Sequence, residues 1–185
     1  MKDRVLCSIL ALTVMFCMLP WICVQKVEAQ GDTFATISAG ASYYMVITSD
    51  KSLWAWGHNT HGQVGDGGAP NSRPLPIKIM DSVSSVSAGH STTMVIKTDG
   101  SLWAWGNNWY GQLGDGTVSS IDTTKNAINN NDKYNPIKIL DSVSAVSAGN
   151  SHTVAVKKDG SLWACAQLIL SVPSKPLDFI GYSRL

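Results

Sequence analysis

Glutamate is almost absent from this sequence, in which nearly every acidic residue is Asp. The exception, Glu28, lies near the apolar N-terminus, so the remainder of the chain uses Asp alone. Glu favours helices, whereas Asp favours turns and helix caps. The absence therefore indicates a turn-rich fold with few helices.

Clustered positive charge is also missing. The chain has 14 Lys and Arg residues against 13 Asp and Glu residues, and no basic run stands out. Affinity for nucleic acid depends largely on clustered Lys and Arg that neutralise phosphates. The sequence therefore predicts no nucleic-acid partner.

Cysteine is scarce outside the N-terminal region. Cys7, Cys17 and Cys23 lie within the first apolar stretch, which leaves Cys165 alone in the rest of the chain. One thiol can form neither an intramolecular disulfide nor a thiolate zinc site. No phosphate-cradling or dinucleotide motif occurs either, so no cofactor is predicted.

Residues 1–29 have the features of a secretory signal helix. Lys2 and Arg4 give a basic start, an apolar stretch spans residues 5–24, and residues 27–29 form a small-x-small cleavage pattern. A retained membrane anchor is the alternative, because that stretch matches the ~20 residues that span a bilayer. Pro20 and the cleavage pattern favour export, to the cell envelope or beyond. Membrane contact is expected only through this segment, if it is not cleaved.

Internal repetition organises the chain after residue 34. Three copies begin with Ser-Ala-Gly, ending at Gly40, Gly89 and Gly149. The spacings of 49 and 60 residues are near the period of propeller blades. Each continues with an apolar pentad, a turn and Ser-Leu-Trp-Ala. The first two copies add a glycine-rich loop and a short run that begins at Pro76 or Pro136. The unit therefore contains about four short strands.

The tryptophan segments show how these strands pack. Residues 53–56 read Leu-Trp-Ala-Trp, and residues 102–105 repeat them. A strand that is apolar on both faces must be covered on both sides. Blades of a propeller provide this cover, since each lies between two neighbours.

The sequence Ser-Leu-Trp-Ala-Trp-Gly-x-Asn-x-x-Gly-Gln-Leu-Gly-Asp-Gly, followed by Val-x-x-Val-Ser-Ala-Gly, resembles the bacterial, secreted-type repeat of the regulator of chromosome condensation family. The resemblance covers roughly residues 35–164, as two full copies and a truncated third. It implies an all-β fold over residues 30–164, a partial, open β-propeller of four-stranded antiparallel blades. Closed propellers need about four to eight blades.

The repeat pattern fails after Ala164, so residues 165–185 are predicted to form a divergent C-terminal tail. Two explanations stay open. The chain is a truncated copy of a longer gene product, or several chains associate through exposed blade faces.

Two segments are candidate protein-binding sites. Trp109 and Tyr110 lie in a predicted loop, where paired aromatic residues are common interface anchors, although packing over the loop is the alternative. The second copy also carries an insertion of about eleven residues, within residues 118–135. Insertions in repeat folds map to loops that often bind partners, and a solvated surface loop is the alternative. Its candidate residues are Asn129, Asn130 and Asp132.

No catalytic or metal-binding constellation emerges. His58 and His61 lack a third ligand with suggestive spacing. Ser91 beside His90 has no nucleophile-elbow context. Asp66 and its counterpart in the second copy lie in Gly-Asp-Gly segments without the remaining calcium ligands, so we expect them to stabilise loops.

These patterns predict a non-catalytic, exported repeat scaffold that binds an unidentified protein. The family resemblance implies a rigid ring whose loop-bearing face contacts other proteins. Guanine-nucleotide exchange activity, as in a nuclear eukaryotic relative, is the alternative, and hydrolysis of envelope polymers is a second one.

Overall fold

The computed structural model describes residues 33–122, 127–166 and 180–182. They belong to one compact unit, Gly31–Leu185, while the predicted signal at residues 1–29 and the rest of the unit Met1–Gln30 lie outside the described residues. The described part is all-β, and it contains no helix that could cross a membrane.

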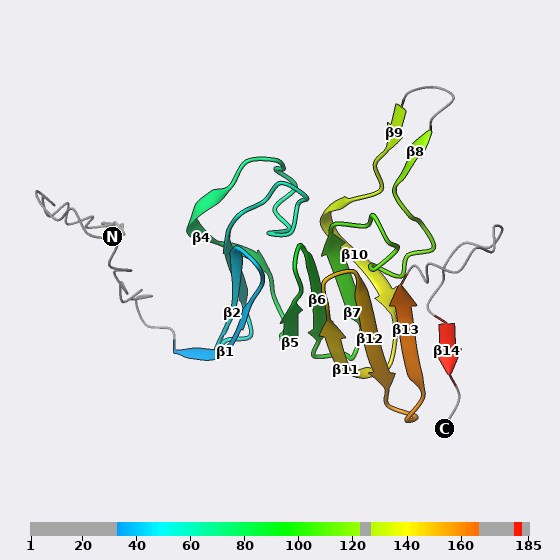
Figure 1. Cartoon of the computed structure of the whole chain (residues 1–185). Helices are drawn as coiled ribbons and strands as arrows, with labels where there is room; N and C mark the ends of the chain where they lie inside the picture. The colour runs from blue at the N-terminus through cyan, green and yellow to red at the C-terminus, as the bar shows by residue number, and fades with distance from the viewer. Residues whose placement is uncertain (1–32, 123–126, 167–179, 183–185) are drawn as a thin grey trace, which may run out of the picture. The chain divides into compact units, whose positions relative to one another are not determined.

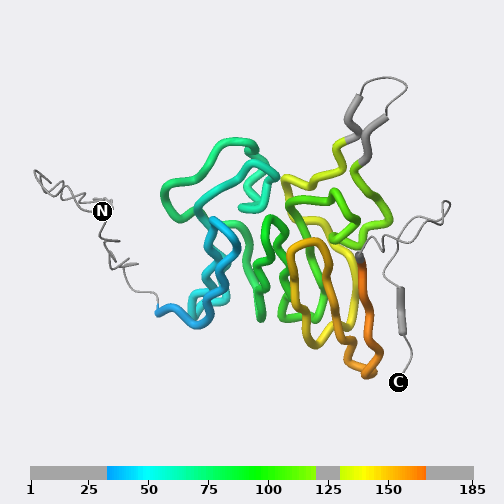
Figure 2. Tube along the Cα trace, in the orientation of Figure 1, coloured from blue at the N-terminus to red at the C-terminus, as the bar shows by residue number. Residues whose placement is uncertain are grey.

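Three four-stranded antiparallel sheets form successive blades (Figures 1 and 2). The first blade contains β1 (Phe34–Ala39), β2 (Tyr43–Thr48), β3 (Leu53–Gly57) and β4 (Arg73–Met80). The second contains β5 (Val83–Ala88), β6 (Thr92–Lys97), β7 (Leu102–Gly106) and β10 (Lys133–Leu140). The third contains β11 (Val143–Ala148), β12 (His152–Lys157), β13 (Leu162–Ala166) and β14 (Ile180–Tyr182). The predicted open propeller of four-stranded blades is confirmed.

The third blade takes its fourth strand from the divergent tail. β14 pairs with β13 in antiparallel register, with Leu162 opposite Tyr182 and Ala164 opposite Ile180. Sequence repetition did not predict this strand, because its residues match nothing upstream. Its antiparallel pairing with β13 places it at the edge of the blade, since an unpaired strand edge can accept an added extended segment.

The Asn-rich insertion also forms strands. β8 (Ser120–Asp122) and β9 (Ala127–Asn129) pair as a hairpin that leaves the loop between β7 and β10 (Figure 1). We expected a loop here. The structure instead joins Ile121 to Ile128 in a short ladder, and the side chains of residues 120–129 lie outside the described part.

Turn chemistry explains how the central strands of each blade meet. Gly100 and Gly160 have positive φ angles of 86° and 85° between the second and third strands of their blades. The Asp residue before each glycine accepts two hydrogen bonds from the following Ser, for example Asp99 Oδ1 from Ser101 N at 2.8 Å and from Ser101 Oγ at 2.6 Å. The turns that we predicted after these apolar pentads are therefore Asp-Gly turns that close the strand pairs.

The hydrophobic core lies between blades. We call the side of the second blade that carries Val86 and Trp105 its leading face, and the side of the first blade that carries Met45 and Leu53 its trailing face. These two faces form one buried cluster. The trailing face of the second blade packs in the same way against the leading face of the third, through Met94, Ile96, Leu102, Ala104, Leu113, Val143, Ala155 and Cys165.

Hydrogen bonds between serine side chains and main-chain N–H groups join the blades near their first strands. Ser38 Oγ accepts a hydrogen bond from Ala88 N at 2.9 Å, and Ser87 Oγ accepts one from Ala148 N at 2.9 Å. A Cβ atom on Gly40 would lie 2.6 Å from the carbonyl oxygen of Gly89. Only glycine permits this close approach of neighbouring turns.

Candidate functional site

The loops between the third and fourth strands of the first two blades share one internal scaffold. Asn59 Oδ1 accepts a hydrogen bond from Val64 N at 2.9 Å, and Asn59 Nδ2 donates to Asp66 Oδ1 at 3.0 Å. Asn108 repeats both bonds in the second loop, with Leu113 N at 3.2 Å and Asp115 Oδ1 at 3.1 Å. One buried Asn thus spans each loop and holds it closed.

The two Gly-Asp-Gly carboxylates each pair with a cation at the start of the blade's outer strand. Asp66 contacts the Arg73 guanidinium, and Asp115 lies 3.1 Å from Lys133 Nζ. Burial alone would raise the pKa of Asp115, but hydrogen bonds from Thr117 and the nearby Lys133 outweigh it and lower the pKa. The predicted loop-stabilising role of these Asp residues is confirmed by these bonds.

A glutamine in each loop ties its blade to the next one. Gln63 Oε1 accepts a hydrogen bond from His61 N at 3.0 Å within its own loop. Its main-chain oxygen also accepts bonds from Trp105 Nε1 at 2.9 Å and Thr93 Oγ1 at 2.8 Å. Sequence reasoning missed this second role, because the acceptor is a backbone atom.

The equivalent contacts in the second loop use Cys165. Gln112 O accepts from Thr153 Oγ1 at 2.9 Å and lies 3.0 Å from Cys165 Sγ. Cys165 therefore occupies the position that Trp105 has in the second blade. The sequence contained a signal for this equivalence, because Cys165 stands where the second Trp of the repeated Trp-Ala-Trp segment would be.

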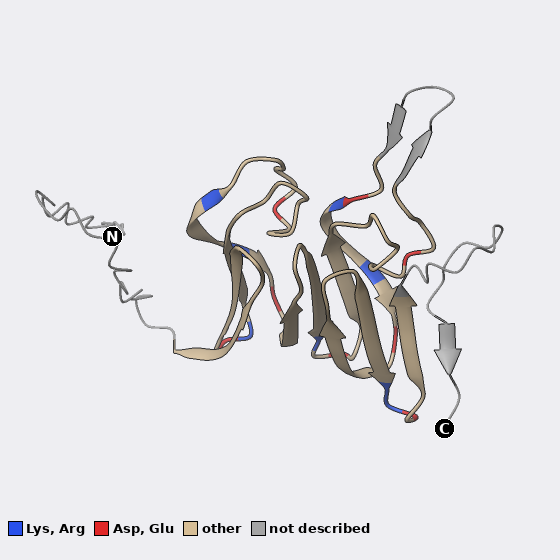
Figure 3. Cartoon of the chain, viewed as in Figure 1, with Lys and Arg blue, Asp and Glu red and all other residues tan. Residues whose placement is uncertain are grey.

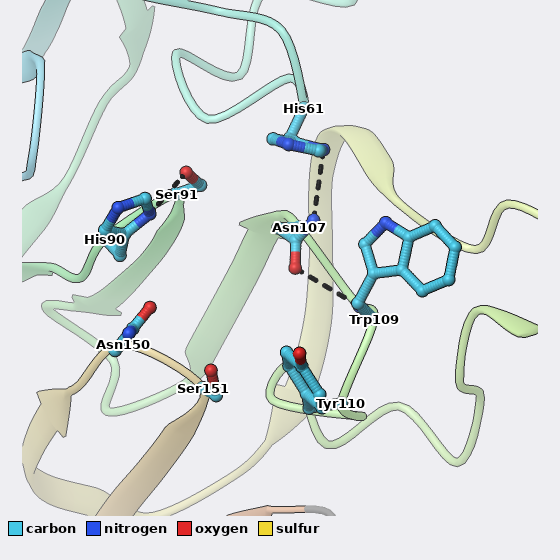
Figure 4. Close-up of a pocket in the computed structure, with 8 residues that line it drawn as sticks. All are labelled: His61, His90, Ser91, Asn107, Trp109, Tyr110, Asn150 and Ser151. Atoms are coloured by element: carbon cyan, nitrogen blue, oxygen red, sulfur yellow. Dashed lines mark hydrogen bonds between the residues drawn. The ribbon is translucent and has the colours of Figure 1, made fainter.

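These rigid loops surround a cavity of about 270 Å³ on the loop-bearing face (Figure 4). Loops and turns of all three blades contribute side chains that supply imidazole, hydroxyl, amide and aromatic groups. The lining residues are His61, His90, Ser91, Asn107, Trp109, Tyr110, Asn150 and Ser151. None of them carries a permanent charge, so the cavity suits neutral polar groups beside an apolar surface.

Hydrogen bonds fix much of this lining. Asn107 Oδ1 accepts a hydrogen bond from Trp109 N at 3.2 Å (Figure 4). The same oxygen accepts a second bond from Gln112 Nε2 at 2.6 Å. Tyr110 N donates to Gln112 Oε1 at 2.8 Å. The backbone that carries the two aromatic residues is therefore held before any partner binds.

A second cavity of about 200 Å³ lies one repeat earlier. His61, His90 and Ser91 line both cavities. The remaining lining of the smaller cavity comes from the first blade's turn and loop, namely Ala41, Ser42, His58, Thr60 and Gln63. In the repeat, Thr60 and His61 occupy the positions that Trp109 and Tyr110 have in the second loop.

The structure separates the predicted binding residues. Trp109 and Tyr110 lie together at the larger cavity, and Tyr110 is 44% exposed. Asn130 is exposed and donates to Tyr134 Oη at 3.2 Å, while Asn129 ends β9 and its side chain lies outside the described part. Among the predicted residues whose side chains are described, only the aromatic pair lines the larger cavity.

Asp132 is nearly enclosed, with its side chain only 2% exposed. Its Oδ1 accepts a hydrogen bond from Asn108 N at 2.8 Å, and its Oδ2 lies 2.8 Å from His61 Nδ1. The carboxylate therefore joins the base of the hairpin to both loops. It contributes no free charge to the surface.

Histidine and carboxylate groups do not gather further. His58 is bonded to Thr60 and Gln63, and His61 to Asp132. Within residues 33–122, 127–166 and 180–182, no group of three or more His, Cys, Asp or Glu residues is placed to hold a metal ion. Figure 3 shows basic and acidic residues interspersed at turns and strand ends.

Family models match most of the described blades. Two models, each described as the regulator of chromosome condensation (RCC1) repeat, match residues 50–96 and 99–156, and residues 34–63 and 83–112, respectively. The chain belongs to the RCC1 repeat family. The matched residues contain the loops and turns that line both cavities of this RCC1-repeat chain.

Solved structures agree on the fold. Yeast RCC1 (Prp20) bound to Kap60 is similar with a TM-score of 0.59 and 24% identity over 71% of this chain and 31% of that one. Human WBSCR16 gives a TM-score of 0.66 and 18% identity over 84% and 40%. Prp20p from Saccharomyces cerevisiae gives 0.63 and 16% over 85% and 40%. The RCC1-repeat chain thus spans well under half the length of these propellers.

Proposed function

We propose that this RCC1-repeat chain is a non-catalytic binding scaffold, exported from the cytoplasm, that holds a protein partner against its loop-bearing face. The larger cavity carries the proposal. Its rim presents Trp109 and Tyr110 on a backbone that internal hydrogen bonds fix in place. Rigid, partly exposed aromatic residues are the commonest anchors of protein interfaces.

The chemistry of the cavity supports a peptide or protein side chain as the bound group. Hydroxyl groups of Ser91 and Ser151, the amide of Asn150 and the imidazole of His90 can donate or accept hydrogen bonds. The aromatic rings cover an apolar surface beside them. A neutral polar side chain that carries an apolar portion would satisfy both parts.

The solved relatives support a protein partner in general terms. Yeast RCC1 was solved bound to Kap60, and the Prp20p structure is described together with its binding to Gsp1p and histones. Export is supported by the signal-like pattern of residues 1–29. Nucleotide exchange and hydrolysis of envelope polymers stay predictions, and we found no feature of the cavity that favours either.

The test is capture of partners from envelope extracts by the full chain. We expect the double variant Trp109→Ala and Tyr110→Ala to lose captured protein, with affinity weakened by about thirtyfold, because truncating an anchor costs about 2 kcal/mol or more. Lys158→Ala, in the turn at the other end of the third blade, is the control and should retain capture. Equal capture by the wild type and the double variant would contradict the proposal.

A further inference from the structure

The direction of the hydrogen bonds around the larger cavity follows from two main-chain donors. Trp109 N and Tyr110 N can donate but cannot accept. Tyr110 N donates to Gln112 Oε1 at 2.8 Å, so the amide nitrogen of Gln112 is left to donate to Asn107 Oδ1 at 2.6 Å. Trp109 N donates to the same oxygen at 3.2 Å. The nitrogen of the Asn107 amide therefore faces His61, 3.0 Å from Nδ1 (Figure 4).

His61 Nδ1 lies between this amide donor and an acceptor. Asp132 Oδ2 is 2.8 Å away, so Nδ1 can bond to only one of the two groups. A lone pair on Nδ1 would face a carboxylate whose side chain is only 2% exposed, which leaves its charge poorly hydrated. A proton on Nδ1 instead forms a charge-assisted hydrogen bond, which is the stronger kind. The proton of the neutral ring therefore belongs on Nδ1.

The other ring nitrogen, Nε2, is then an acceptor. In a neutral imidazole one nitrogen donates and the other accepts. The His61 side chain is 34% exposed, and it lines both cavities. Nε2 has no hydrogen-bond partner among the side chains that the structure describes. A bound group can therefore donate to it.

The surroundings of His61 favour a donor without charge. Trp109 and Tyr110 supply apolar ring surface in the same cavity, and its lining holds no permanent charge. A carboxylate would face the Nε2 lone pair and, behind the ring, the charge of Asp132. An ammonium group would lose its hydration without contacting a carboxylate. Phenol and carboxamide groups avoid both costs, because they donate, are neutral and carry an apolar portion.

We propose that the larger cavity selects a neutral partner side chain that donates a hydrogen bond, a phenol or a carboxamide, and that His61 Nε2 is the acceptor. Asp132 is a positioning residue, because it keeps the proton of His61 on Nδ1. This inference rests on the proposed function, since it names the group that the cavity takes from the partner.

Two neutral probes of similar shape test the selectivity without the partner. para-Cresol donates through its hydroxyl group, whereas its methyl ether can only accept. We expect the full chain to bind para-cresol about fivefold more tightly than the ether, which is the effect of one neutral hydrogen bond. Nuclear magnetic resonance measures both affinities at about pH 8, where an ordinary imidazole is uncharged. The nitrogen shifts of His61 should show the proton on Nδ1.

Asp132→Asn should reverse the polarity of His61 while it keeps the shape of the side chain. The new amide oxygen can still accept from Asn108 N, and the amide nitrogen would donate to His61 Nδ1. The proton should then move to Nε2, and the preference for para-cresol should be lost or reversed. Asp99→Asn makes the same exchange in the turn at the other end of the second blade and should leave the preference unchanged. Circular dichroism checks that both variants keep their β structure.

The wild type alone can overturn the inference. A proton on His61 Nε2, equal affinities for the two probes or no binding of para-cresol would each do so. An unchanged preference in folded Asp132→Asn would also overturn it. Partner capture is measured separately with the Trp109 and Tyr110 variant, so selectivity can fail while capture persists, and capture can fail while selectivity holds.

Discussion

At the scale of single residues, one main-chain carbonyl in each loop binds two donors from the next blade. Trp105 Nε1 uses the first carbonyl, and Cys165 Sγ uses the second. A thiol is much smaller and a weaker donor than an indole. Cys165 nevertheless remains buried, because the hydrophobic cluster with Leu113 and Ala155 encloses it.

Cys165 should be protected from thiol reagents in the folded chain. Burial raises the pKa of this thiol to about 12, so the reactive thiolate is scarce at neutral pH. Because the folded pKa is raised, this residue should also cost stability as the pH rises above the unfolded value of 9.0. Peptide mapping after iodoacetamide treatment should show slow labelling at Cys165 in buffer and rapid labelling in denaturant. Rapid labelling of the folded chain would contradict the packing described.

At the scale of elements, the β8–β9 hairpin is attached through its base. Asn131 N donates to Ser119 Oγ at 2.9 Å, and Asn131 Nδ2 donates to Val118 O at 2.8 Å. The next residue, Asp132, is hydrogen-bonded to Asn108 in the second loop and to His61 in the first. The strands beyond the base are therefore an appendage to the second blade.

Replacing residues 120–129 by a short Gly-Ser-Gly link should change the free energy of unfolding by less than about 1 kcal/mol, because surface loop length has a small entropic effect. Asp132→Ala should lower the free energy of unfolding by about 1–3 kcal/mol, since Asn108 N would lose its buried acceptor. Urea unfolding followed by circular dichroism measures both values. A larger loss for the hairpin replacement than for Asp132→Ala would show that the strands themselves support the blade.

Repetition in the sequence was enough to predict the strands of the first two blades. Comparison of the two copies also drew attention to Trp109 and Tyr110, because the first copy has Thr60 and His61 at these positions. It could not predict β14, whose residues have no counterpart upstream. It also could not show that Asp132 is enclosed, because burial there depends on contacts with Asn108 and His61, which are distant in sequence. Local patterns identify elements, whereas such contacts depend on how the elements meet.

At the scale of the whole molecule, the second blade is the only described blade that is covered on both faces within one chain. Amides of β6 and β7 should therefore exchange most slowly with solvent, whatever the protein concentration. Hydrogen exchange followed by mass spectrometry at low and high concentration measures this. Slower exchange in β2 or β12 than in β6 at low concentration would contradict the prediction.

The turn that carries His90 and Ser91 forms part of the wall of both cavities. Any side chain that displaces this turn changes the shape of two sites at once. Ligands in adjacent repeats would therefore be coupled through a common wall, and a substitution at His90 would alter both. Among the described repeats, divergence of one site alone is expected where a residue lines one cavity only, as Thr60 lines the smaller cavity and its counterpart Trp109 lines the larger one.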